Sequence, residues 1–255
     1  MSTSGSSKRI NQYGLSRHIP AAIERKVRKQ CGFGCVVCGS IPYQYNHFEP
    51  PFPQAREHNP EGICLLCGSC HTKATNDLLS DATIKKATQS PKCLEQGFSC
   101  FKLDVGERFP VVLLGNSNFI GNPTIIRAFG KRLFAVDKPE EPGGPCIISA
   151  MFYDREGITT CRIVHNEWQG LSSNWDVECI RNKFTVRRAN REIALRMQSN
   201  PPHELVVDRL DMFYKGFRIV VDTDGRTTTY LPDGRMWFQL NGARFIGNDA
   251  VIVIE

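Results

Sequence analysis

The sequence predicts an α+β protein in which a small N-terminal unit precedes a larger, mainly antiparallel all-β region. Two observations predict this division. Two Cys-x2-Cys pairs fall within the first third of the 255 residues, among segments with helical or mixed apolar patterns. Beyond about residue 100 the pattern changes to short β-type runs separated by turn signals. We therefore expect a disordered basic tail over 1–18, a folded unit over 19–90 and a β-rich region over 100–255.

The N-terminal unit is expected to contain three helices and two strands. The first helix should begin at Pro20, because proline lacks the N–H that the first turn leaves unpaired, and it should end at Gly32. Ile23 and Val27 share its apolar face. The other expected elements are a strand over 43–48, a strand over 63–66, a helix from the 67–71 segment towards Leu79, and a helix over 81–88 capped by Ser80.

The β-rich region contains nine short apolar or β-branched runs. Their spacing and the turn signals between them indicate a sandwich, a barrel or a short solenoid. The tetrapeptide Phe-Ile-Gly-Asn occurs at 119–122 and again at 245–248, which is compatible with two related β layers but does not establish a repeat. The expected strands are 111–114, 147–152, 160–164, 184–186, 193–197, 205–210, 217–221, 236–240 and 250–254.

Positive charge is concentrated near the N-terminus. The net charge is +6, and residues 1–30 hold seven basic side chains and one acid, so the remainder is balanced. This asymmetry favours a polyanionic partner at that end, although a solvated helix face would carry the same charges. No run of about 20 apolar residues predicts a membrane span, and the first residues lack the apolar core of a signal peptide. We therefore expect a cytoplasmic protein.

Cysteine spacing gives the most specific signal. An odd total of 11 cysteines without a secretion signal argues against a disulfide framework. Cys35 and Cys38 form one Cys-x2-Cys pair, and Cys67 and Cys70 form another. Two such knuckles can direct four thiolates at one Zn²⁺ in a closed tetrahedral site, which leaves no open position for chemistry and is therefore structural. The alternative is four buried thiols without a metal.

Around these cysteines the sequence resembles the HNH endonuclease family, whose ββα-metal unit is held by paired Cys-x2-Cys knuckles. The resemblance covers about residues 19–88 and implies a nuclease domain over 19–90. The segments that carry it are Cys-Val-Val-Cys-Gly at 35–39, Tyr-Asn-His at 45–47, and Ile-Cys-Leu-Leu-Cys-Gly-Ser-Cys-His-Thr-Lys at 63–73.

The resemblance implies roles for individual positions. His47 matches the general base that activates water, and His71 matches a ligand of the catalytic divalent ion. Asn46 stands where the family usually has an aspartate ligand, and its lack of charge is expected to weaken Mg²⁺ binding. Gly62 replaces the asparagine that steadies the base. The candidates for substitute ligands or orienting groups are His58, Asn59 and Asn76.

These features predict a metal-dependent endonuclease that hydrolyses DNA phosphodiester bonds. A neutral histidine suits the deprotonation of water, and Mg²⁺ or Mn²⁺ would stabilise the leaving oxygen. Double-stranded DNA is the expected partner, and the β-rich region could position substrate, form a homodimer or regulate cleavage. The alternative is a catalytically weakened zinc-containing nucleic-acid-binding protein on the same fold. The expected phosphate contacts are Arg25, Lys26, Arg28, Lys29 and Lys73.

Overall fold

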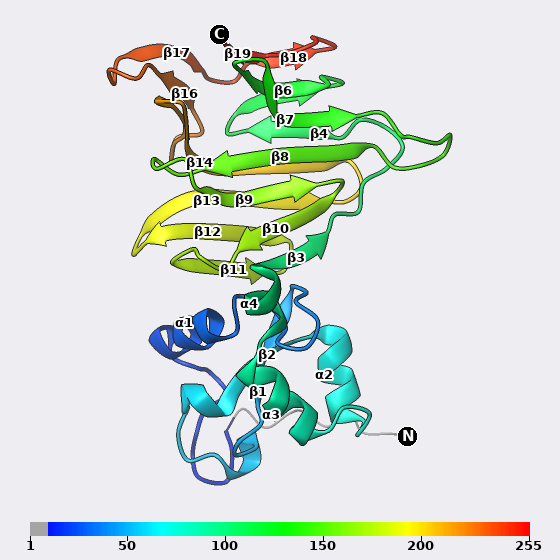
Figure 1. Cartoon of the computed structure of the whole chain (residues 1–255), viewed down its shortest axis with the longest axis vertical. Coiled ribbons are helices and arrows are strands. Elements are labelled where there is room, and N and C mark those ends of the chain that lie inside the picture. Colours follow the sequence, from blue (N-terminus) through cyan, green and yellow to red (C-terminus); the bar gives the residue numbers. More distant parts are fainter. Residues whose placement is uncertain (1–9) are drawn as a thin grey trace. The chain divides into compact units, whose positions relative to one another are not determined.

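The computed structural model describes residues 10–255, and these divide into two compact units. Unit 1 ends at Gly97 and unit 2 begins at Phe98 (Figure 1). Residues 1–9, the first half of the tail expected to be disordered, lie outside the described residues. Among the described helices, none combines the length and the apolar character that crossing a membrane requires.

Unit 1 is built around a β-hairpin followed by a helix. Its elements are α1 (Ala21–Gln30), β1 (Tyr43–His47), η1 (Phe52–Gln54), η2 (Pro60–Gly62), β2 (Ile63–Cys67), α2 (Gly68–Thr75), α3 (Asp81–Gln89) and α4 (Lys92–Gln96). β1 and β2 pair antiparallel, with Asn46 opposite Cys64 and His47 opposite Ile63. α2 follows β2 directly and contacts both strands, so the local order is ββα (Figure 1).

The helices of unit 1 follow the sequence signals at most of their ends. α1 ends just before Gly32, which adopts a φ of +67° beyond the helix. Ser80 caps α3, its hydroxyl accepting a hydrogen bond from the Thr83 N–H at 3.2 Å. α2 is shorter than expected: it ends before Asp77, whose φ of +58° interrupts the helix ahead of Leu79.

Residues 10–18, which were expected to be disordered, are held against η1. The Asn11 side chain donates to the carbonyl oxygens of Phe52 and Ala55, at 2.7 Å in each case. Its Oδ1 accepts from the N–H groups of Tyr13 and Leu15. One side chain therefore satisfies four backbone groups, which orders this part of the tail.

Unit 2 consists of two β-sheets (Figure 1). The first contains, in spatial order, β19 (Ile252–Ile254), β6 (Thr124–Ala128), β7 (Lys131–Asp137), β8 (Ile147–Tyr153), β9 (Thr159–Val164), β10 (Glu167–Leu171) and β3 (Phe98–Lys102). The second contains β11 (Asp176–Ile180), β12 (Lys183–Ala189), β13 (Glu192–Asn200), β14 (Glu204–Tyr214), β15 (Phe217–Val221), β16 (Thr227–Tyr230) and β17 (Met236–Leu240). β14 also pairs with β4 (Val111–Leu114), and β5 (Ser117–Ile120) lies between β4 and β18 (Arg244–Ile246).

The two sheets of unit 2 face each other and share a core. Trp168 of β10 stacks on Phe184 of β12 with ring centroids 4.9 Å apart. Tyr153 of β8 meets Tyr214 of β14 at 5.5 Å. The architecture is therefore a sandwich, one of the three that the sequence indicated, and most of its strand pairs are antiparallel.

The two Phe-Ile-Gly-Asn segments lie side by side rather than in separate layers. β5 and β18 pair in parallel, with Phe119 opposite Phe245. β6 and β19 also pair in parallel, with Ile126 opposite Ile252. Asn122 donates to the carbonyl oxygen of its counterpart Asn248, 126 residues later, at 3.1 Å. The two paired segments thus pass together from the second sheet (β5 and β18) to the first (β6 and β19).

Candidate metal centre and histidine pocket

The four cysteines of the two knuckles converge in unit 1. Their sulfur atoms all lie within 4.8 Å of one another. Cys38 Sγ is 3.6 Å from Cys67 Sγ and 3.9 Å from Cys70 Sγ. Four sulfurs around a tetrahedral Zn²⁺, with Zn–S bonds of about 2.3 Å, are about 3.7 Å apart. The cluster could therefore hold one zinc ion. Within residues 10–255 no other group of three or more His, Cys, Asp or Glu side chains is arranged for a metal.

The backbone fixes both knuckles. Gly39 donates its N–H to the Cys35 carbonyl at 2.8 Å, and its φ of +80° is one that glycine adopts without strain. Cys67 is the N-cap residue of α2, and Cys70 lies in the first helical turn. The β1–β2 hairpin and the start of α2 therefore bring the two Cys-x2-Cys pairs together.

α4, which the sequence did not predict, packs on the first knuckle. The Lys92 N–H donates to the Val36 carbonyl at 2.9 Å. Cys93 is fully buried, and its sulfur lies 3.5 Å from the Gly39 carbonyl oxygen. Gly32 makes room for it, because a Cβ at Gly32 would lie only 2.8 Å from the Cys93 Cβ.

The cysteine sulfurs differ in acidity. A hydrogen bond with Cys35 lowers the pKa of the exposed Cys38 to about 4. Burial, with the nearby charge of Cys38, raises the pKa of Cys70 to about 11. Zinc ligands are thiolates, so metal binding at this cluster releases protons.

His47, the predicted general base, lines an open pocket of about 270 Å³ at the end of β1. Arg17 and Phe52 contribute to its wall, with the Arg17 guanidinium 4.5 Å from the Phe52 ring centroid. Burial lowers the pKa of His47 to about 4, assisted by the charges of His58 and Arg17. His47 is therefore neutral at pH 7, the form that can accept a proton from water.

Among the three substitute candidates, His58 is the one that contacts His47. Its Nδ1 lies 3.0 Å from His47 Nε2. The His58 ring is buried, and its Nε2 has no hydrogen-bond partner within residues 10–255. Asn59 instead caps η2 by accepting from the Glu61 N–H at 3.1 Å, and Asn76 is the exposed C-cap of α2.

Close backbone packing explains Gly62, where the resemblance expects asparagine. A Cβ at this position would lie 1.9 Å from the carbonyl oxygen of Glu49. The Gly62 carbonyl also accepts the Phe48 N–H at 3.0 Å, which holds the segment after β1 against it. An asparagine side chain therefore does not fit here, and the place next to His47 is taken by His58 instead.

The expected ligands of a catalytic divalent ion are not gathered at His47. Tyr45 and His47 both line the pocket, whereas Asn46, on the opposite face of β1, hydrogen-bonds the Cys64 thiol. Burial nevertheless raises the pKa of Cys64 to about 12. His71 lies half-buried in α2 and is not part of the pocket wall.

Arg28 is not available to phosphate, contrary to expectation. Its side chain is only 5% exposed; it donates to the Tyr45 hydroxyl at 2.9 Å and lies 3.9 Å from Glu24. The guanidinium thus holds α1 against β1. The other predicted phosphate contacts are more accessible: Lys26, Lys29 and Lys73 are exposed, and Arg25 is partly exposed.

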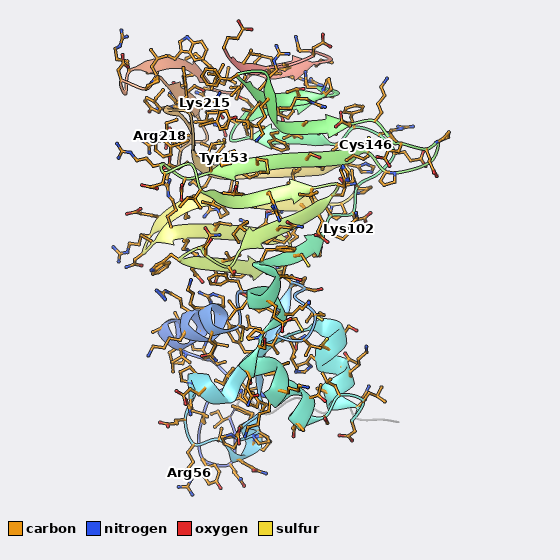
Figure 2. The ribbon with its side chains drawn as sticks, in the orientation of Figure 1. Arg56, Lys102, Cys146, Tyr153, Lys215 and Arg218 are labelled. Atoms are coloured by element: carbon orange, nitrogen blue, oxygen red, sulfur yellow. The ribbon has the colours of Figure 1, made fainter. Side chains whose placement is uncertain are left out.

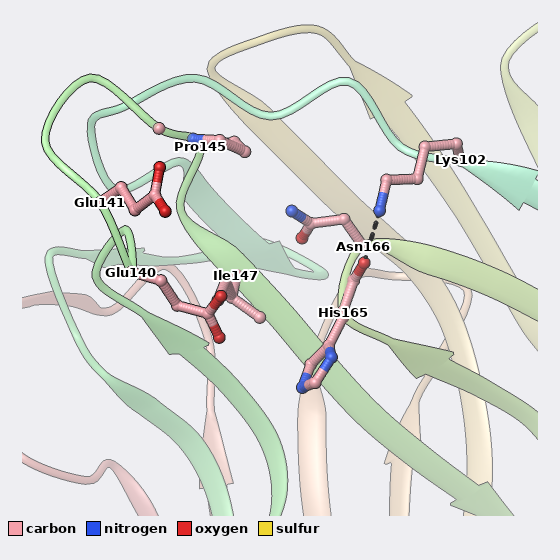
Figure 3. A pocket seen from close by; sticks show the side chains of 8 residues that line it. Lys102, Glu140, Glu141, Pro145, Ile147, His165 and Asn166 are labelled. Carbon is pink, nitrogen blue, oxygen red and sulfur yellow. Dashed lines mark hydrogen bonds between the residues drawn. The ribbon is translucent and has the colours of Figure 1, made fainter.

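Unit 2 has a separate pocket of about 260 Å³, which the sequence did not predict (Figure 3). Glu140, Glu141 and His165 line it, and Lys102 Nζ donates to the His165 carbonyl oxygen at 2.8 Å. Asn166 is buried, and its amide accepts from the Ile148 N–H and donates to the Cys146 carbonyl, both at the start of β8. These bonds explain how the pocket wall is held, and we assign no chemistry to it.

No protein-family model matches the chain, and neither a curated protein nor a solved structure matches it significantly. The similarity to HNH endonucleases therefore rests on the motifs quoted above.

Proposed function

We propose that unit 1 is a nuclease domain that hydrolyses DNA phosphodiester bonds, with His47 as general base. The observation that carries this proposal is the position of His47, a neutral imidazole in an open pocket that also contains the Arg17 guanidinium. Phosphodiester hydrolysis needs a base for the attacking water and positive charge near the phosphate oxygens. Both groups face one pocket.

His58 supports this role as a positioning residue. A neutral imidazole carries one N–H, so His47 can accept a proton through Nδ1 only when its Nε2–H donates to His58 Nδ1. The contact fits either direction of donation; with His47 as the donor it leaves Nδ1 as the acceptor and holds the ring in place. It takes over the steadying role that the resemblance assigns to the residue at Gly62.

Mg²⁺ or Mn²⁺ is retained as a proposed cofactor on the resemblance alone. The Asn46 amide faces away from His47, and His71 is outside the pocket wall, so the expected ligand set does not fit the described arrangement. The four-cysteine cluster supplies a structural role for zinc only.

A plasmid-cleavage assay tests the base. We expect the wild-type chain to cut supercoiled DNA in Mg²⁺ or Mn²⁺, and His47→Ala to be slower by roughly 100- to 10,000-fold. His58→Ala should lower the rate less, since it removes only the orienting contact. Gln44→Ala, an exposed change on the same strand, serves as the control. Equal cutting by wild type and His47→Ala would show that His47 is not the base.

A zinc-containing nucleic-acid-binding protein is the second candidate. It is favoured by the absence, within residues 10–255, of a second metal-binding cluster besides the four cysteines. In that case the wild-type chain binds DNA without cutting it in either cation. Within the nuclease candidate, His71→Ala tests the ligand that the resemblance implies: unchanged cutting would show that His71 does not hold the catalytic ion.

A further inference from the structure

Aromatic and cationic side chains gather at one end of the unit 2 sandwich. We call this the hairpin-tip surface and define it by Phe129, Lys131, Tyr153, Tyr214, Lys215 and Trp237. Tyr214 lies 6.3 Å from Phe129 and 5.5 Å from Tyr153 between ring centroids. Phe217 lies between Phe129 and Trp237: its ring centroid is 5.7 Å from that of Phe129 and 6.0 Å from that of Trp237. Figure 2 shows Tyr153 and Lys215 near each other on unit 2.

Two of these residues occupy strained backbone positions. Phe129-Gly130 joins β6 to β7, and Lys215-Gly216 joins β14 to β15. Phe129 has a φ of +49° and Lys215 a φ of +47°, values that asparagine and glycine tolerate far better in such two-residue hairpin turns. Strain of this kind concentrates at functional sites. The turns therefore present a large ring and an ammonium group where folding alone favours small residues.

The rings at the tips remain exposed. Phe129 is 39% and Trp237 45% accessible, whereas Tyr153 and Tyr214 are half-buried and close the end of the core. Sealing the sandwich thus accounts for the two tyrosines but not for the outer rings. The exposed parts of Phe129 and Trp237 are accessible to a flat partner, although Lys215 Nζ already lies over the Phe129 ring.

Both lysines contact aromatic rings. Lys215 Nζ lies 4.6 Å from the Phe129 ring centroid, and Lys131 Nζ donates to the Tyr153 hydroxyl at 2.9 Å. Neither forms an ion pair with a carboxylate in the described part of the chain. Acidic residues also lie at this end: Glu255 follows β19 beside Phe129, Asp154 and Glu156 are in the turn after Tyr153, and Asp233, which pairs with Arg235, is in the turn after β16. The two ammonium groups are therefore available to an anionic ligand.

We propose that the hairpin-tip surface binds single-stranded nucleic acid. Bases would stack on Phe129 and Trp237, and the lysines would contact the phosphates between them. Stacking on exposed aromatic side chains beside cationic groups is the usual mode of sequence-tolerant single-strand binding. A duplex would satisfy the charges but keeps its base faces inside the helix, and an acidic peptide would leave the ring faces unused. The surface is in unit 2, so this inference does not depend on the nuclease assignment.

The test is fluorescence anisotropy of a labelled oligothymidylate with the full chain, in buffer without added Mg²⁺ or Mn²⁺. A His47→Ala background keeps the probe intact. Phe129→Asn removes the ring while relieving the positive φ, so the variant should fold at least as well and bind roughly 5- to 150-fold more weakly. Trp237→Ala should weaken binding similarly, and Lys215→Asn should reduce both the affinity and its salt dependence.

Arg181→Asn is the matched control. Arg181 also has a positive φ, of +58°, in a β-hairpin turn, but it lies outside the hairpin-tip surface. It should leave affinity unchanged although it removes one positive charge. The inference is overturned if the full chain does not bind the probe at low salt, or if Phe129→Asn and Trp237→Ala bind as the parent does. It is also overturned if duplex DNA or polyglutamate competes as well as unlabelled oligothymidylate, because the ring faces then add nothing.

Discussion

Phe119 and Phe245 stack with ring centroids 5.3 Å apart and an interplanar angle of 22°. They occupy the same position in the two Phe-Ile-Gly-Asn segments and face each other directly across the parallel β5–β18 pair. Phe119 is fully buried, whereas Phe245 is partly exposed. The C-terminal strands β18 and β19 therefore complete the sandwich by placing Phe245 opposite Phe119 and Ile252 opposite Ile126.

A double-mutant cycle on this pair should show direct coupling. We expect Phe119→Ala to cost about 3–5 kcal/mol of unfolding free energy and Phe245→Ala less, because only Phe119 is fully buried. Urea denaturation of the single and double variants should give a coupling energy of about 0.5–1.5 kcal/mol. Phe119→Ala combined with Phe217→Ala is the control and should be additive within about 0.5 kcal/mol. Additive behaviour of the Phe119 and Phe245 changes would show that the stacking contributes nothing beyond burial.

Replacing one knuckle cysteine should remove zinc and unfold unit 1 together. Cys38→Ser or Cys67→Ser leaves three sulfurs, and the binding energy of a structural zinc is part of the folding energy. We expect metal analysis to find one zinc per chain in the purified wild type and none in either variant. Both variants should also have lower thermal stability than the wild type. Cys100→Ser, in unit 2 and outside the cluster, should keep its zinc. A Cys67→Ser chain that retains a full equivalent would contradict the four-sulfur site.

The knuckles could be predicted because their ligand spacing is local. Two residues separate Cys35 from Cys38, and a knuckle turn needs nothing else to direct both sulfurs to one point. The contact between His47 and His58 could not be predicted in the same way. It depends on how the segment after β1 folds back over Gly62, and no local pattern encodes that path.

Each of the nine strands predicted in unit 2 overlaps an observed strand, although 250–254 is shortened to Ile252–Ile254, and other strands were missed. β16 has three buried threonines, Thr227 to Thr229, and β10 has a buried Gln169 and Gly170, so neither shows an apolar alternation. β5 and β18 pair with each other although 126 residues separate them in the chain. The repeated tetrapeptide was the one sequence feature that indicated these two strands. Pairing between distant segments, rather than local propensity, defines these strands.

Gly62→Asn, which introduces the residue that the HNH resemblance expects, should destabilise the chain rather than improve a catalytic site. Any Cβ at this position overlaps the Glu49 carbonyl oxygen, and the backbone that would have to move also pairs with Phe48. We expect a loss of about 1–3 kcal/mol of unfolding free energy, typical of overpacking, measured by urea denaturation. Gly68→Asn is the control, since a Cβ at Gly68 has no neighbour within 4 Å. If Gly62→Asn folded as well as the control, close packing against Glu49 would not be the reason that glycine stands here.

Acid should weaken unit 1 through His47. Burial lowers the pKa of this imidazole from 6.5 to about 4 in the folded chain, so the unfolded chain binds the proton more readily between those values. The stability that depends on neutral His47 is therefore complete above pH 6.5 and is lost as the pH falls towards 4. Because the side chain is only half buried, we expect a loss of about 1–2 kcal/mol of unfolding free energy rather than the full free energy that corresponds to the pKa shift.

Thermal denaturation at a series of pH values should show a shallower acid decline for His47→Gln than for wild type, whereas Gln44→Ala should follow the wild-type curve. Parallel curves for His47→Gln and wild type would mean that His47 titrates alike in both states, and the neutral base assigned to the pocket would lose its physical support.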